Sequence, residues 1–174
     1  MKKIILVLTI GLLSISCSSS SDDSSSSSGN LKWKFKMDGV QYEWSGDFPY
    51  SATSGQSSYL GEPASTPTIS LVSPIISSGN RQVMLTFTFP NESTGTSIID
   101  DSVIGNSASL VINSEDIYST SSDFGGVISL NITQMASSTN GITKGTFSGT
   151  MVKLDQELQT VEITEGSFEA IRIQ

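Results

Sequence analysis

The sequence has no histidine, and this absence excludes whole classes of active site. Without an imidazole there is no Ser-His or Cys-His pair for nucleophilic catalysis and no histidine-ligated metal. Basic residues are also scarce, because 9 lysines and arginines stand against 17 aspartates and glutamates, for a net charge of −8 at pH 7. Nucleic acids require basic patches that neutralise phosphates, so this acidic balance argues against a nucleic-acid partner.

Cysteine occurs once, at Cys17, so no disulfide can form within one chain and stability must come from packing. Long hydrophobic runs are missing too. The longest, residues 4–13, is too short to cross a hydrocarbon core of about 30 Å as a helix. It follows two lysines and precedes the small residue Ser16, an order typical of a secretory signal peptide. Residues 1–16 are therefore predicted to be a signal peptide.

The pair Ser16-Cys17 resembles the lipobox of bacterial lipoproteins. In that family the cysteine is acylated after cleavage before it, so the resemblance implies lipidation of Cys17 and a membrane anchor. Residues 17–30 are mostly serine and have nothing to bury, which predicts a disordered tether. Within it, Asp22-Asp23 is similar to the acidic export signal of Bacteroidota-type lipoproteins. The resemblance implies a lipid-anchored outer-membrane protein, either exposed at the cell surface or on the periplasmic face.

Residues 31–174 are long enough for one domain with a sizeable core, and they open with a clear hairpin signal. Hydrophobic and polar residues alternate over residues 31–37 and again over 40–44, and Asp38-Gly39 separates the two runs. This pattern predicts a β-hairpin with a two-residue type I′ turn. The predicted pairs are Met37 with Val40, Lys36 with Gln41, Phe35 with Tyr42, Lys34 with Glu43 and Trp33 with Trp44.

Further short alternating runs, bounded by turn residues, predict strands along the rest of the chain. They cover residues 68–73, 82–89, 97–99, 107–112, 126–134 and 160–173. No segment after the signal shows a helical period. We therefore expect an all-β fold, an antiparallel β-sandwich of about nine to eleven strands, with a closed or partly open β-barrel as the alternative.

Two turns lead to finer predictions. If Asn140-Gly141 closes a two-residue turn, Leu130 lies opposite Met151; a longer Ser-rich loop is the alternative. In the last strand, the alternation of inward residues slips by one near Gly166, which predicts a β-bulge at that position. After the bulge, the sequence leaves two alternatives: either the even-numbered or the odd-numbered side chains face inward. The even set is Phe168, Ala170 and Arg172, and the odd set is Ile171 and Ile173.

Two segments near the C-terminus, Gly-Thr-Phe-Ser at residues 145–148 and Ile-Thr-Glu-Gly-Ser-Phe at 163–168, carry a further resemblance. Together with an opening strand that ends in Asp-Gly, they resemble a family of Bacteroidota-type lipoproteins that carry a β-rich domain of unknown function. The resemblance covers most of residues 31–174. It implies a fold and a location, but no chemistry.

Residues 45–68 show no period and predict a long loop rich in Ser, Gly and Pro. The loop carries Phe48, Tyr50 and Tyr59, and aromatic rings set among small residues are typical of binding loops. One hypothesis is that these rings, with Trp44 at their base, form a recognition surface for a glycan or another envelope protein. The alternative is that they fold back and cap one end of the domain.

Asp101-Ser102-Val103 is similar to the short O-glycosylation signal of Bacteroidota-type exported proteins, which implies Ser102 as an acceptor. Acidic side chains near residues 100, 115 and 123 match no known metal-binding or hydrolytic spacing and are interpreted as solvated turn residues. No catalytic residue, metal site or cofactor is predicted. The expected function is non-enzymatic binding, with a structural envelope component and a carboxylate-based hydrolase as alternatives.

Overall fold

The computed structural model describes residues 31–46, 49–50, 58–59, 62–63, 69–90, 93–153, 155 and 158–172. The predicted signal peptide, Cys17, the tether and Phe48 lie outside the described residues. In the part of the chain that is described, no helix is long and apolar enough to cross a membrane.

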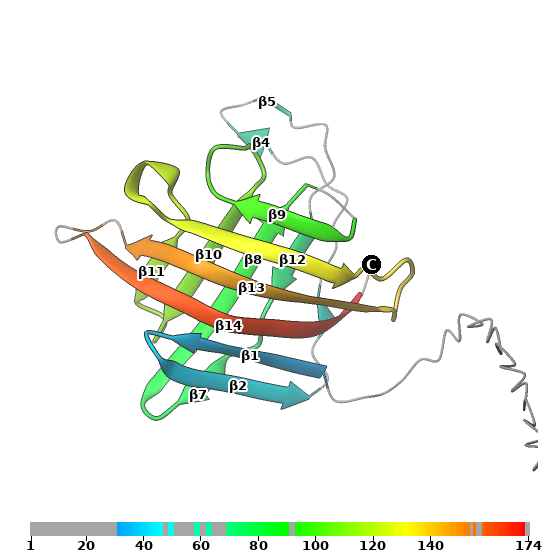
Figure 1. The fold of residues 1–174 in the computed structure, drawn as a ribbon, viewed down its shortest axis with the longest axis horizontal. Coiled ribbons are helices and arrows are strands. Elements are labelled where there is room, and N and C mark those ends of the chain that lie inside the picture. The colour runs from blue at the N-terminus through cyan, green and yellow to red at the C-terminus, as the bar shows by residue number, and fades with distance from the viewer. Residues whose placement is uncertain are drawn as a thin grey trace, which may run out of the picture.

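The described residues form almost exclusively β-strands, so the predicted all-β class is confirmed (Figure 1). Besides the strands, the described residues include one short 3-10 helix, η1 (Ser122–Phe124). The strands are β1 (Leu31–Met37), β2 (Val40–Gly46), β3 (Pro49–Tyr50), β4 (Ser58–Tyr59), β5 (Glu62–Pro63), β6 (Ile69–Val72), β7 (Ile76–Ser78), β8 (Arg81–Phe89), β9 (Gly95–Ile99), β10 (Ser107–Ile112), β11 (Asp116–Ser119), β12 (Val127–Gln134), β13 (Ile142–Lys153) and β14 (Gln159–Arg172).

Twelve strands belong to one curled sheet, whose main path is β2-β1-β14-β13-β11-β10-β8-β6. The path turns at β13, which pairs along most of its length with β12 but meets β11 only where Val152 lies opposite Ser119. Figure 1 shows β9, β12, β13, β14, β1 and β2 in one layer, with β8 and β10 crossing behind it. The result is a half-barrel that combines the two expected forms, because one continuous sheet supplies both packed layers.

A hydrophobic core lies between the two layers, and the period-two alternation correctly predicted which residues enter it. The inward residues of β8 and β12 are all buried: Val83, Leu85, Phe87, Phe89, Ile128, Leu130 and Ile132. At the centre, the ring of Trp33 has no exposed surface and stacks on Phe168 at a centroid distance of 5.2 Å. Aromatic pairs of this kind stabilise a core by about 0.5–1.5 kcal/mol beyond their buried area.

The β1–β2 hairpin has the register that the sequence predicts in all five pairs. Asp38 and Gly39 have φ angles of 48° and 79°, so both turn residues are left-handed, as a type I′ turn requires. Val40 is 47% exposed, although Met37 opposite it has no exposed surface.

Replacing Gly39 by valine is expected to lower the free energy of unfolding by more than about 1 kcal/mol, because a β-branched residue is strained at positive φ. Nothing lies within 4 Å of the position that a Cβ would take, so the loss arises from the backbone alone. Urea denaturation measures it, with Gly39→Asn as the control, since asparagine tolerates this conformation. An unchanged midpoint for Gly39→Val would contradict the turn type.

The predicted bulge in β14 is confirmed at Glu165 and Gly166. On both flanking strands the pairing register shifts by one residue at this point, and Glu165 has a φ of 53°. After the bulge, Phe168 and Ala170 are buried, so the even-numbered alternative is correct. The extra residue restores inward packing on both sides of the bulge.

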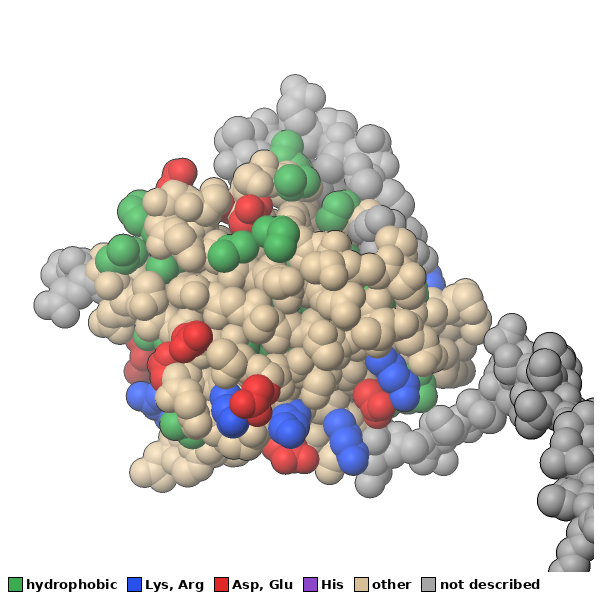
Figure 2. Space-filling model, in the orientation of Figure 1, with side chains coloured by type: hydrophobic (Ala, Val, Ile, Leu, Met, Phe, Trp, Pro, Cys, Tyr) green, Lys and Arg blue, Asp and Glu red, His purple; other side chains and the backbone are tan. Residues whose placement is uncertain are grey.

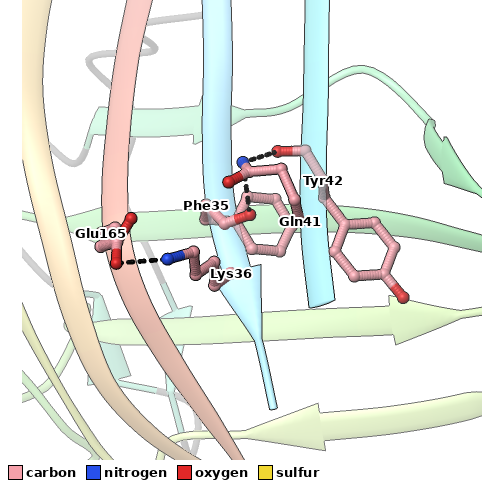
Figure 3. A network of polar contacts seen from close by, with 5 residues as sticks. All are labelled: Phe35, Lys36, Gln41, Tyr42 and Glu165. Carbon is pink, nitrogen blue, oxygen red and sulfur yellow. Dashed lines mark hydrogen bonds and ion pairs between the residues drawn. The ribbon is translucent and has the colours of Figure 1, made fainter. Parts of the chain in front are cut away.

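Side chains satisfy groups that the bulge leaves without a strand partner (Figure 3). Phe35 has no partner residue on β14, and its carbonyl oxygen accepts a hydrogen bond of 3.1 Å from Gln41 Nε2. Gln41 Nε2 also donates to the carbonyl oxygen of Tyr42 at 3.0 Å. Lys36 Nζ pairs with Glu165 Oε1 at 2.5 Å, and this contact lowers the pKa of the Glu165 carboxyl.

The predicted two-residue turn at Asn140-Gly141 is wrong. Leu130 lies opposite Phe147, four residues away from the predicted partner on β13. The backbone of Asn140 and Gly141 bonds to the end of β14 instead, since Asn140 N–H donates to the Arg172 carbonyl at 2.7 Å and Arg172 N–H donates to the Gly141 carbonyl at 2.9 Å. The connection is therefore longer than two residues.

Candidate functional site

The predicted aromatic site lies only partly within the described residues. Trp44 is partly buried and packs against the core, and its ring covers Gly46, where an added Cβ would lie 2.7 Å from it. Tyr50 belongs to β3, whose backbone runs parallel to the end of β14, and Tyr59 belongs to β4, which pairs with β5. Phe48 and the side chains of the two tyrosines lie outside the described part. A recognition surface made of these rings remains a prediction.

The turn acid Asp101 ties two loops together. Its carboxylate accepts hydrogen bonds from Ser122 N–H and the Ser122 hydroxyl, both at 2.7 Å, and from the Ser121 hydroxyl at 3.2 Å. These bonds lower the pKa of the Asp101 carboxyl, and the bond from the Ser122 N–H has the largest effect. Ser102, the predicted glycosylation acceptor, is exposed, and its N–H donates to Asp100 at 3.0 Å. No group of three or more possible metal ligands occurs among the residues with described positions.

A polar cleft of about 520 Å³ lies where four distant segments meet. These segments are the β1–β2 turn, the start of β8, the β10–β11 turn and the start of β14, and Figure 1 shows the first two at the lower left. The polar side chains of the cleft are Asp38, Arg81, Asn113, Asp116, Gln159 and Thr160. The apolar ones are Ile112, Tyr118 and Val161. The volume is within the range of about 300–1,000 Å³ that is typical of ligand pockets.

Two left-handed turn residues hold the rim of this cleft in the same way. Asn113, with a φ of 51°, donates its N–H to the Gln82 carbonyl at 2.8 Å, and its Oδ1 accepts the Gln82 N–H at 2.9 Å. Asp38 makes the equivalent pair with Glu162, at 2.9 Å in both directions. Each turn residue thereby adds one pair of hydrogen bonds to the strand beside it. These bonds fix the backbone of both turns, and a rim that is already ordered lowers the cost of ordering it on binding.

The carboxylate of Asp116 is already engaged on one side of the cleft. Lys153 Nζ lies 2.7 Å from Asp116 Oδ1 and 2.9 Å from Asp155 Oδ2. The hydrogen bonds to these carboxylates raise the pKa of the Lys153 ammonium group, and the bond to Asp116 has the larger effect. The group is therefore charged at neutral pH. The ammonium group is shared between Asp116 and Asp155, so it offsets part of the negative charge that Asp116 brings to the cleft.

Other polar groups of the cleft remain open to a ligand. The hydroxyl of Tyr118 donates to Gln159 Oε1 at 3.3 Å, which leaves the amide N–H donors of Gln159. Arg81 is exposed and forms no ion pair with any described residue. The cleft thus combines a guanidinium group, amides and carboxylate oxygens, which together can both donate and accept hydrogen bonds.

No protein-family model, curated protein or solved structure matches this chain.

Two shallower hollows, of about 380 Å³ and about 250 Å³, lie on the outer face of β12, β13 and β14. Hydroxyl and amide side chains line most of the first one, including Ser129, Asn131 and Thr146. Figure 2 shows that the middle of this face is largely uncharged, while charged side chains gather at its lower edge, over β1 and β2. These hollows are more open to solvent and smaller than the cleft, so they surround a small ligand less completely.

The cleft cannot be read from the sequence, although the Asp38-Gly39 turn at its rim can. Asn113 follows an alternating run and precedes a serine, which is a usable turn signal. No pattern in the chain, however, places Asn113 beside Arg81 or Gln159. These residues meet only because the sheet order brings their strand ends together.

Proposed function

We propose that this protein is a lipid-anchored outer-membrane lipoprotein whose domain is a non-enzymatic saccharide-binding module. The observation that supports binding is the polar cleft of about 520 Å³, which draws its side chains from four segments. Sugar hydroxyls both donate and accept hydrogen bonds, and the amides and carboxylates of the cleft match them. The resemblance of Ser16-Cys17 to a lipobox supports the anchor.

Binding is favoured over hydrolysis because the two carboxylates of the cleft already have partners. Asp38 Oδ1 accepts the Glu162 N–H at 2.9 Å, and Asp116 pairs with Lys153 at 2.7 Å. A hydrolytic pair needs one carboxyl group that releases a proton and one that is free to attack or to activate water. Groups held in strand ladders and ion pairs are better suited to fixing the shape of a binding site.

Replacing Gln159 by alanine is expected to weaken saccharide binding by roughly tenfold, which corresponds to the loss of about 1.4 kcal/mol of hydrogen bonding. Gln159 is exposed, so the melting temperature should change little. A glycan array identifies the ligand, and calorimetry measures the affinity of each variant. Gln134→Ala, an equally exposed glutamine on β12, is the matched control. If the wild-type chain binds no saccharide, the binding proposal is wrong and a structural envelope role is favoured.

Replacing Cys17 by alanine is expected to move the protein from the membrane fraction to the soluble fraction and to abolish labelling by a radioactive fatty acid. The reason is that a single thiol carries the acyl attachment, and stable anchoring needs more than one chain or signal. Ser18→Ala is the control and should leave both readouts unchanged. Retention of membrane binding and acyl label by Cys17→Ala would refute the lipoprotein assignment.

A further inference from the structure

Arg81 differs from the other charged groups of the cleft. Asp38 is bonded to Glu162, and Asp116 is paired with Lys153. Arg81 has no carboxylate partner among the residues whose positions are described. Lys34 likewise has no ion pair with a described residue, but it does not line the cleft, whereas Arg81 does.

The position of Arg81 is set by the strand ladder beside it. Its neighbour Gln82 exchanges two backbone-to-turn hydrogen bonds with Asn113, at 2.8 and 2.9 Å. Arg81 also pairs with Ser78 across the β7–β8 hairpin. The backbone of Arg81 is therefore held on two sides, while its side chain lines the cleft.

We infer that the ligand of this cleft is an anionic saccharide, whose carboxylate or sulfate group binds the Arg81 guanidinium. The inference rests on the proposed saccharide-binding function. A guanidinium group presents a planar fork of donors that matches the oxygens of a carboxylate or sulfate group in a bidentate fashion. The carboxylate oxygens of Asp38 and Asp116 then accept hydrogen bonds from hydroxyls elsewhere on the same ligand.

This arrangement explains how an acidic protein can bind an acidic ligand. The net charge of −8 repels anions at long range, but salt at physiological strength screens charges beyond about 8 Å. At contact distance, the nearest charges decide. There, Lys153 is shared by Asp116 and Asp155, and the Asp38 carboxylate is bonded to the Glu162 N–H. Arg81 has no ion pair with a described residue, so its guanidinium group is the cation that an anionic group can contact directly.

The test compares polymers that differ only in charge. The full chain is assayed against polygalacturonate and its methyl ester for the carboxylate, and against dextran sulfate and dextran for the sulfate. We expect the wild type to bind one charged member about tenfold more tightly than its neutral counterpart. Arg81→Gln should remove most of that preference, and Arg81→Lys should restore part of it, because the point charge remains but the fork is lost.

Lys34→Gln is the matched control. Lys34 is an exposed cation on β1 that has no ion pair with a described residue, and it does not line the cleft. It changes the net charge by the same amount as Arg81→Gln and should leave the preference intact. Equal losses in both variants would overturn the inference in favour of general electrostatic attraction. Equal binding of charged and neutral polymers, with Arg81→Gln unaffected and Gln159→Ala weakened, would overturn it while leaving saccharide binding in place. Absence of binding to every polymer and to a glycan array would overturn both proposals.

Discussion

Replacing Phe147 by alanine is expected to lower the free energy of unfolding by about 3–5 kcal/mol, the usual cost of removing a buried phenylalanine ring. Phe147 is 3% exposed and lies at the meeting point of the aromatic core. Its ring centroid is 5.0 Å from that of Phe87, 5.9 Å from that of Phe35 and 6.2 Å from that of Trp33. These rings come from strands of both layers, so the substitution would leave a cavity between the layers and remove contacts across it.

Urea denaturation followed by tryptophan fluorescence measures this loss, because Trp33 reports directly on the packing around Phe147. Phe124→Ala is the matched control, since Phe124 is 51% exposed and its truncation should cost less than about 0.5 kcal/mol. A loss below about 1 kcal/mol for Phe147→Ala would show that the two layers do not depend on this ring.

Replacing Gly166 by valine is expected to destabilise the domain by roughly 3 kcal/mol or to prevent folding, which is the upper range for overpacking a closed site. An added Cβ would lie 2.4 Å from the carbonyl oxygen of Phe147 and 2.5 Å from its ring. The first of these atoms belongs to the backbone of a paired strand, so it cannot move without breaking the β13–β14 ladder. The bulge therefore requires glycine for steric reasons.

The comparison with Gly39→Val separates, in one experiment, two physical reasons why a position requires glycine. Gly39 has a φ of 79° but open space around it, whereas Gly166 has an ordinary φ but no space. We expect the Gly166 variant to lose clearly more stability than the Gly39 variant in the same urea titration. Equal losses would indicate that the strand at the bulge can move away from an added side chain.

The sequence by itself determined the features that depend on neighbouring residues. The hairpin register followed from Asp38-Gly39 between two alternating runs, and all five pairs are present. The bulge at Gly166 followed from a slip in alternation, because an extra residue must restore inward packing. In each case one face of a strand must be buried, and a period of two residues is enough to identify that face.

Only the tertiary structure decided which strands meet and how far they slide past one another. The β12–β13 register differs from the prediction by four residues, and an even shift keeps the same side chains inward, so alternation cannot detect it. For the same reason the cleft could not be read from the chain. Arg81, Asn113 and Gln159 lie at ends of strands far apart in sequence, and the curl of one continuous sheet, set by packing across the core, brings those ends together.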